Sequence, residues 1–263
     1  MLALALAGCG SVPAGDSPDA ANPLNGDSFI KTVVLDWTGG ESDVAANPLG
    51  PISFSTMRLS GGTTLAEIDS DEFREDVRAQ VELLLSALEP AQFVVINGEA
   101  EDYPNDTAVF FTNDIVPGGG LQVGQTHLDQ CDLESHGSVV VWVGTLLSVA
   151  NGFEYNQWVN ALSNVAAHEI GHTVGFFHPE TIYDDLTEYE ESHDIMMGTH
   201  NLVELVSEQA FLIHQDTCPE EVAAASGGVA YQISSYTAEP IGLSSDRTLR
   251  ATEIRFQCCH LDK

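Results

Sequence analysis

Three histidines and a glycine stand close together at residues 168–178, His-Glu-Ile-Gly-His-Thr-Val-Gly-Phe-Phe-His. His168 and His172 are four residues apart, so on a helix they lie on one face and can bind one metal ion. Gly175 can adopt a left-handed backbone conformation and end the helix, which lets the chain bring His178 back as a third ligand. Three protein ligands leave a fourth tetrahedral position for water. This is the arrangement of catalytic rather than structural zinc.

Glu169 directly follows the first of these histidines. From that position its carboxylate can accept a proton from a metal-activated water as the water attacks a peptide carbonyl. A bare pair of histidines four residues apart is often no more than two surface or core side chains. Here the spacing of five residues within eleven is specified, which disfavours that interpretation. The pattern therefore predicts one catalytic Zn²⁺ ion, with Glu169 as the general base.

This segment resembles the zinc-binding motif of the metzincin metallopeptidases, His-Glu-x-x-His-x-x-Gly-x-x-His. Members of that clan also carry a methionine in a tight turn beneath the metal. Asp194-Ile-Met-Met-Gly198 follows the motif here, and Met196 aligns best with the family methionine, with Met197 as the neighbouring candidate. The resemblance implies zinc endopeptidase activity and assigns no subfamily. It also implies an α/β fold: a twisted, mostly parallel sheet of about five strands, with an active-site helix and a C-terminal helix.

Hydrophobic periodicity predicts the elements that would position the motif. We expect strands at 30–37, 93–96, 108–112, 121–128 and 138–143, and helices at 70–89, at 157–174 and from Ser207 to about 215. Asp69 or Ser70 can cap the first helix. This order of strands and helices is similar to that of metzincin catalytic domains, so residues 29–218 are expected to form such a domain.

The N-terminal segment resembles a bacterial lipobox at Leu6-Ala7-Gly8-Cys9, which implies that Cys9 is lipidated. The apolar run of residues 1–9 is short for a signal segment and has no Lys or Arg, so we expect the true start to lie upstream. Residues 10–28 are rich in Gly, Ser, Pro, Asp and Asn, which is typical of a flexible tether. The chain is thus predicted to be exported and either lipid-anchored to a bacterial membrane or secreted. The alternative is a disordered tail with a chance cysteine.

Four further cysteines would suit an oxidising compartment and predict two disulfides. Adjacent cysteines rarely bond each other, so Cys258 and Cys259 are each expected to pair with Cys131 or Cys218, in either order. Residues 219–263 would then be a β extension tied back to the domain, or otherwise a loose tail.

The chain is strongly acidic, with 40 Asp and Glu against 8 Lys and Arg and a formal net charge of −32. Nucleic-acid binding is excluded because it needs a basic face, and an anionic membrane would repel the chain unless a lipid anchor held it there. A Ca²⁺ site is a further candidate, although the spacing matches no defined calcium loop. Its ligands would be Asp114, Asp129, Asp132 and Glu134.

The residues together predict a zinc-dependent endopeptidase that acts on a protein or peptide substrate. Two alternatives stay open. One is a catalytically silent metzincin-fold protein that binds partners at the cell surface. The other is a zinc hydrolase of a non-peptide amide. The intact Glu169 and the three histidines argue against the silent binding protein.

Overall fold

The computed structural model describes most of the region from Ile30 to Leu212 and three short pieces beyond it. The described residues are 30–89, 91–117, 121–127, 137–150, 152–181, 186–212, 234–235, 256–257 and 259–260. Cys9, the predicted tether 10–28, and Cys131, Cys218 and Cys258 lie outside them. The predicted lipidation and disulfides therefore stay predictions.

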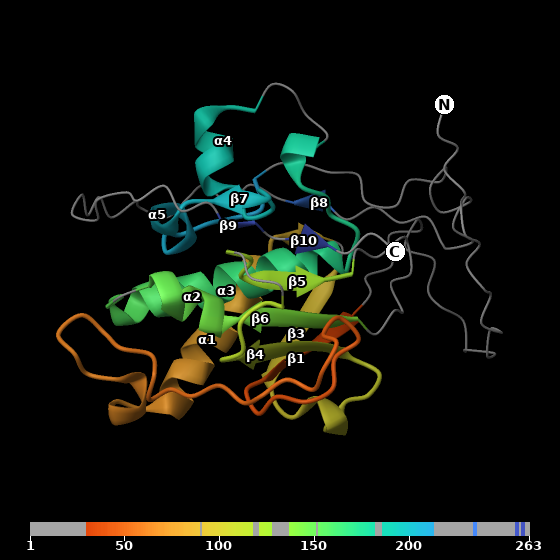
Figure 1. The fold of residues 1–263 in the computed structure, drawn as a ribbon. Coiled ribbons are helices and arrows are strands. Elements are labelled where there is room, and N and C mark those ends of the chain that lie inside the picture. Colours follow the sequence, from red (N-terminus) through yellow and green to blue (C-terminus); the bar gives the residue numbers. More distant parts are fainter. Residues whose placement is uncertain are drawn as a thin grey trace, which may run out of the picture.

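A six-stranded sheet lies at the centre of the molecule, in the order β10-β5-β6-β4-β1-β3 (Figure 1). Its strands are β1 (Ile30–Asp36), β3 (Gln92–Asn97), β4 (Thr107–Thr112), β5 (Gly124–Thr126), β6 (Ser138–Trp142) and β10 (Cys259–His260). The pairs β3–β1, β1–β4 and β4–β6 are parallel, whereas β5 runs antiparallel to β6 and β10 runs parallel to β5. The predicted α/β fold with a mostly parallel sheet is confirmed.

The remaining elements are short apart from two long helices. The helices are η2 (Leu65–Glu67), α1 (Ser70–Leu85), η3 (Ala100–Asp102), α2 (Val143–Val149), α3 (Tyr155–His172), η4 (Pro179–Thr181), α4 (Glu188–His193) and α5 (Leu202–Leu205). Two small antiparallel sheets pair β2 (Leu88–Glu89) with β8 (Ser234–Ser235) and β7 (Thr199–His200) with β9 (Phe256–Gln257).

The helix α1 covers one face of the sheet with a single apolar stripe. Asp69 caps its N-terminus, because its carboxylate accepts the backbone N–H groups of Asp71 and Glu72. Every third or fourth residue is apolar and buried, namely Phe73, Val77, Val81, Leu84 and Leu85. The helix ends at Leu85, earlier than predicted, because Leu88 and Glu89 leave it to pair with β8.

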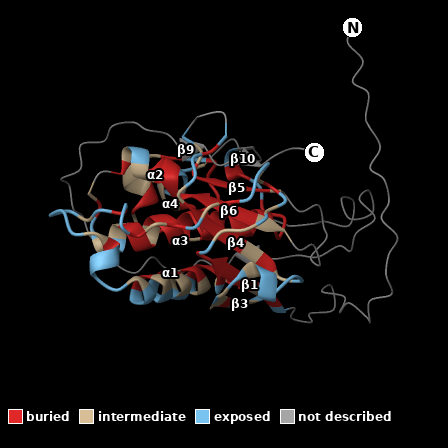
Figure 2. Ribbon diagram, turned by 60° about the horizontal axis from the view of Figure 1, so that its bottom comes forward, coloured by how far each residue is buried: buried red, intermediate tan, exposed pale blue. Residues whose placement is uncertain are grey.

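The helix α3 packs beside α1 on the same face and is buried almost all round. Only its first turn and Asn160 reach intermediate or greater exposure, as the red of this helix in Figure 2 shows. Apolar residues of alternate sheet positions, such as Val109, Phe111 and Val141, form the main core with the two helices. A helix buried on every side is held by many packing contacts, so its side chains keep fixed positions.

The opposite face of the sheet is covered by loops and the short helix η3. Phe110, Val140 and Trp142 alternate with the residues of the main core along β4 and β6 and so point to this other side. Val44 and Val116 of the neighbouring loops pack on them. The metal motif and this second core therefore lie on different faces of the sheet.

Two more predicted elements differ from the structure, in addition to the early end of α1. The strand expected at 121–128 forms only over the three residues of β5. The helix α2 follows β6 directly, and the sequence patterns did not predict this helix. The last helix was expected to begin after Ser207, but α5 begins at Leu202, and residues 207–212 are not helical.

The early start of α5 has a local and a tertiary cause. Asn201 accepts the N–H groups of Val203 and Glu204, which makes it the helix cap. After α5 the chain does not continue as a helix. The side-chain amide of Asn164 on α3 donates to the carbonyls of Leu205 and Ser207, so these carbonyls are bonded to α3. These long-range bonds explain why a cap at Ser207 was wrongly predicted.

No helix among the described residues combines the length and apolar character needed to cross a membrane.

Candidate metal centre

The three histidines of the motif meet at one point inside the protein. The Nε2 atoms of His168 and His172 are 3.0 Å apart, and those of His172 and His178 are also 3.0 Å apart. The Nε2 atoms of His168 and His178 are 3.2 Å apart. Nitrogens bound to one tetrahedral zinc at about 2.0–2.1 Å would lie about 3.3–3.4 Å from each other. Among the described residues, this is the only group of three or more His, Cys, Asp or Glu arranged to hold a metal ion.

Backbone carbonyls determine which nitrogen of two rings faces this point. His168 Nδ1 lies 2.6 Å from the carbonyl oxygen of Ile195, and His172 Nδ1 lies 2.7 Å from that of Phe176. A carbonyl oxygen can only accept, so each Nδ1 must carry a proton and donate it. In the neutral ring the Nε2 atom then presents a lone pair. Lone pairs that face one another at 3 Å repel unless a cation lies between them, so the donor set fits a metal ion.

The surroundings of His168 keep it in the neutral form that a metal needs. Burial, followed by the neighbouring His172 and His178, holds the pKa of His168 well below its ordinary value of 6.5. The bond to the carbonyl of Ile195 acts in the opposite direction and is outweighed. A metal ion therefore competes with fewer protons here than at an exposed histidine.

The turn at Gly175 brings the third histidine back to the helix. Gly175 has a φ of 91°, the left-handed conformation that ends helices. Its N–H donates to the carbonyl of His172, and the N–H of Phe176 donates to the carbonyl of Gly171. The same turn places the carbonyl of Phe176 on His172 Nδ1. Gly175 thus has the left-handed conformation that was predicted for the helix end, and its turn also places a carbonyl against His172.

Met196 lies against α3, the helix that carries His168 and His172. It is buried, and a Cβ added at Gly171 of α3 would meet its sulfur at 2.5 Å. The turn that carries it is held by Asp194, whose carboxylate accepts the N–H groups of Met196 and Leu212. Since Ile195 of this turn accepts the bond from His168, the turn both supports the helix and orients a ligand.

Glu169 is fully buried next to strand β5. A Cβ added at Gly124 of β5 would meet Glu169 Cδ at 2.8 Å and would lie closer still to Oε1. The strand can approach the carboxylate this closely only because residue 124 is a glycine. Glu169 is therefore held between the helix that carries the ligands and an antiparallel strand of the sheet.

Several residues that shape the centre were not singled out from the sequence. Gly198 lies against His178, since an added Cβ would meet His178 Nδ1 at 2.6 Å. Lys31 of β1 is buried and its Nζ lies 3.4 Å from the carbonyl oxygen of Thr173, just after the end of α3. His200 is buried beyond the methionine turn, and its charge also disfavours protonation of His168. Each acts across a large sequence separation, so no local pattern could have identified them.

Only one of the four predicted calcium ligands, Asp114, lies among the described residues, so the calcium site stays a prediction. The carboxylate of Asp114 accepts the N–H of Gly50 at 2.9 Å, which ties two loops together. The other three candidates, Asp129, Asp132 and Glu134, lie outside the described residues.

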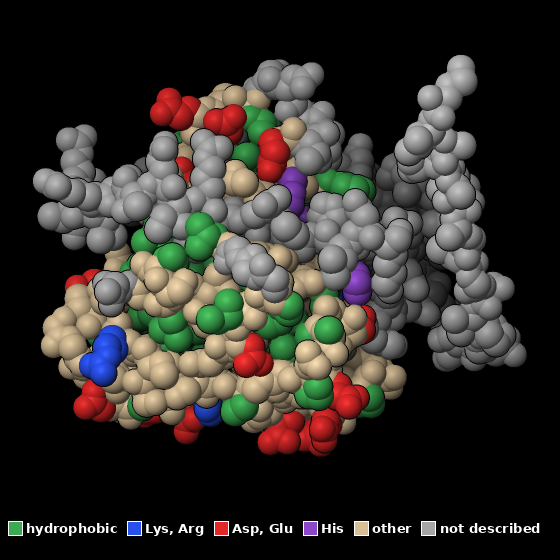
Figure 3. Space-filling model, viewed as in Figure 1, with side chains coloured by type: hydrophobic (Ala, Val, Ile, Leu, Met, Phe, Trp, Pro, Cys, Tyr) green, Lys and Arg blue, Asp and Glu red, His purple; other side chains and the backbone are tan. Residues whose placement is uncertain are grey.

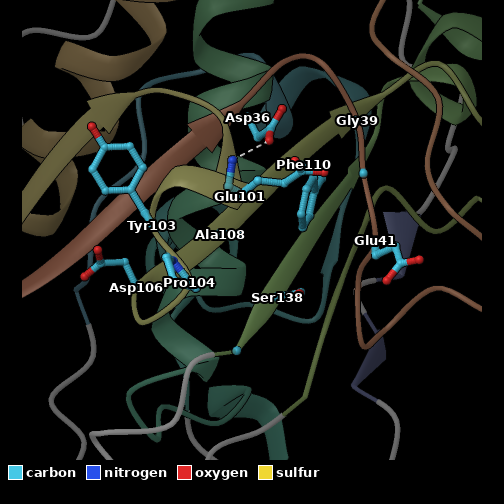
Figure 4. A pocket seen from close by; sticks show the side chains of 13 residues that line it. Asp36, Gly39, Glu41, Glu101, Tyr103, Pro104, Asp106, Ala108, Phe110 and Ser138 are labelled. Carbon is cyan, nitrogen blue, oxygen red and sulfur yellow. Dashed lines mark hydrogen bonds between the residues drawn. The ribbon is translucent and has the colours of Figure 1, made fainter.

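A separate acidic pocket of about 270 Å³ lies on the loop-covered face of the sheet, beside Phe110 (Figure 4). Asp106 and Glu41 lie on opposite sides of it, and Asp36 lies at its back. The carboxylate of Asp36 is already used, because it accepts N–H groups of Thr38 and Ala100. None of the three histidines lines this pocket, so it is distinct from the metal centre.

No protein-family model and no curated protein matches this chain.

Proposed function

We propose that the chain is a zinc-dependent endopeptidase of the metzincin type. The observation that carries this proposal is that three histidine Nε2 atoms lie within 3.0–3.2 Å of one another. The buried Glu169 directly follows the first of these histidines, His168. The spacing of the motif, the buried Met196 and the mostly parallel sheet support the same assignment.

The ligand set suits Lewis-acid chemistry. A zinc ion held by His168, His172 and His178 would keep its full positive charge, polarise a substrate carbonyl and lower the pKa of a water toward ~7. His168 and His172 each donate a hydrogen bond from Nδ1 to a backbone carbonyl, that of Ile195 and that of Phe176. These bonds keep the two imidazoles oriented, so they need not rearrange during turnover.

Glu169 would move the proton. As the water oxygen bonds to the peptide carbonyl carbon, the carboxylate takes a proton from the water. When the C–N bond then breaks, Glu169 delivers that proton to the leaving nitrogen, which departs as an amine. The strand β5 and the helix α3 enclose the carboxylate, which limits its motion between these two steps.

We propose that the chain lies outside the cytoplasm and is attached to a bacterial membrane through a lipid on Cys9. This part rests on the sequence, where Leu6-Ala7-Gly8-Cys9 resembles a lipobox and four further cysteines can form disulfides.

The test compares the native chain with Glu169→Gln, using a diverse peptide library as substrate. Both proteins are stripped with a chelator and reloaded with one equivalent of zinc. We expect zinc-dependent cleavage by the native chain. Glu169→Gln should lower kcat by about 10²- to 10⁴-fold, because a general base typically contributes that much. Bound zinc, measured by mass spectrometry, should be unchanged.

Glu191→Gln is the matched control, since it removes the charge of an exposed glutamate on α4. It should keep native turnover. Full activity of the Glu169→Gln variant would contradict the mechanism. Zinc binding without cleavage by any form of the protein would favour a binding protein or a hydrolase of another amide.

A further inference from the structure

The strand β5 lies directly against the proposed catalytic glutamate. It pairs with β6 along one edge, with Gln125 opposite Val140. Its backbone passes against Glu169 at Gly124. An extended peptide that added itself to the other edge of β5 would gain main-chain hydrogen bonds beside the proposed general base. That edge is therefore a natural place for an extended substrate.

The chain's own C-terminal strand occupies this edge. In β10, Cys259 pairs with Gln125 and His260 pairs with Thr126. Figure 1 shows β10 lying along β5, on the side away from β6. The N–H and C=O groups of β5 cannot pair with β10 and with an added peptide at the same time.

The preceding strand β9 ties the same segment to the other side of the metal centre. Gln257 pairs with Thr199 of β7, which directly follows Gly198, the residue that lies against His178. Gln257 and Cys259 are two residues apart, so their Cα atoms are separated by at most about 7 Å. The strands β9 and β10 thus pair with two strands that border the centre: β7, which follows Gly198 beside His178, and β5, which contacts Glu169.

We propose that β10, held in place together with β9, acts as an intramolecular competitor that keeps the peptidase latent by occupying the substrate edge of β5. This inference rests on the proposed function. A tethered segment has an effective concentration near the millimolar range, so even weak strand pairing would exclude most of a dilute substrate. Displacement of the segment would expose the edge, as would cleavage of the chain before Phe256 followed by reduction of the disulfides predicted at Cys258 and Cys259.

The first test removes the segment and measures kcat/KM on the peptide library with zinc bound. Deletion of residues 256–263 should raise kcat/KM by about tenfold or more, because the competitor is no longer tethered. Deletion of residues 261–263 alone is the matched control, since it leaves β9 and β10 in place, and it should keep the native value.

A second variant perturbs β10 in the full-length chain and guards against misfolding of the truncated form. His260→Pro removes an N–H and imposes a φ near −65°, both of which oppose strand pairing. His260→Pro should raise kcat/KM, as the deletion of residues 256–263 should. Asp262→Pro lies beyond both strands in the sequence and should leave kcat/KM unchanged. A folded, zinc-loaded His260→Pro variant with native kcat/KM and a truncated form with native kcat/KM would overturn the proposal.

A binding measurement separates this proposal from the proposed function. The probe is a fluorescent peptide of residues 252–261 with both cysteines replaced by serine. It should bind the chain that lacks residues 256–263 at least about tenfold more tightly than the native chain, because the tethered copy competes. Equal binding to both would overturn the edge competition. Preferential binding without any peptide cleavage would support the competition and contradict the endopeptidase.

Discussion

Gly198 lies directly against the imidazole of His178, at the place where any side chain would collide with this ligand. The N–H of Gly198 also donates to the carboxylate of Glu180 at 2.8 Å, which holds the backbone in place. A Cβ would meet Glu180 Oε1 at 2.5 Å and His178 Nδ1 at 2.6 Å, both far inside normal contact. The position of the third ligand thus depends on a residue that binds no metal.

Gly198→Ala is expected to weaken zinc binding by about tenfold to a hundredfold, the usual effect of disturbing the partners of a metal ligand. Competition with a chromophoric chelator measures the affinity. Gly137→Ala is the matched control, because its Cβ would only reach Thr173 Cγ2 at 3.7 Å, an ordinary contact. Native zinc affinity in Gly198→Ala would show that His178 is not held by this close approach.

At the level of elements, the end of α3 decides where the ligands go. The helix presents His168 and His172 on one face, and the turn after it returns the chain toward that face. The turn depends on the positive φ of Gly175. The methionine turn then approaches from another part of the chain and contacts the helix at Gly171. One helix end therefore gathers ligands and supports from two segments.

Gly175→Ala should lower the free energy of unfolding by about 1–2 kcal/mol, because a Cβ disfavours the left-handed conformation. It should also weaken zinc binding, since the turn positions both His172 and His178. Gly175→Asn should lose less, because asparagine tolerates this conformation. Urea unfolding of the metal-free proteins gives the free energies. Equal losses for Ala and Asn would mean that crowding at the site, rather than φ, is responsible.

At the scale of the whole molecule, acidic side chains far outnumber basic ones, with 40 Asp and Glu against 8 Lys and Arg. Figure 3 shows red Asp and Glu side chains at the top and along the lower edge of one face, with few Lys and Arg among them. With a formal net charge of −32, the chain repels itself and polyanions at neutral pH. Buried His168 responds to pH in a different way.

The metal-free protein should lose stability as the pH falls below 6.5. Burial lowers the pKa of His168 in the folded state, so below pH 6.5 the unfolded chain binds a proton that the folded chain does not. Wherever the unfolded state binds more protons than the folded state, the free energy of unfolding decreases as the pH is lowered. The loss of stability therefore begins near pH 6.5 and continues until the pH reaches the lowered pKa of His168 in the folded state.

Urea unfolding of the chelated protein at pH 7.5 and at pH 5.5 measures this effect. Most carboxylates stay ionised across this range, so their titration contributes little. His168→Gln should show a smaller decrease than the native chain, because the variant lacks the group that titrates. An equal decrease in both would assign the pH dependence to other residues.

Much of the candidate site could be predicted from adjacent residues. The spacing of His168, Glu169 and His172 on a helix, and a glycine where that helix must end, are local features with local physical causes. The strands β1, β4 and β6 could be predicted for the same reason, because runs of apolar residues indicate buried parallel strands.

Other features were decided only by contacts between distant segments. The contact of Met196 with Gly171 and that of Gly124 with Glu169 depend on how the chain folds back, and small residues at close approaches leave no periodic signal. Asn164 holds the chain after α5 open and overrides a helix cap at Ser207. The pairing of β10 with β5 joins residues more than a hundred positions apart. The sequence by itself thus determined which residues can bind a metal, because helix geometry sets their spacing. The tertiary structure alone decided what packs around them and which segment lies on the edge of β5, because packing and strand pairing depend on where the rest of the chain lies.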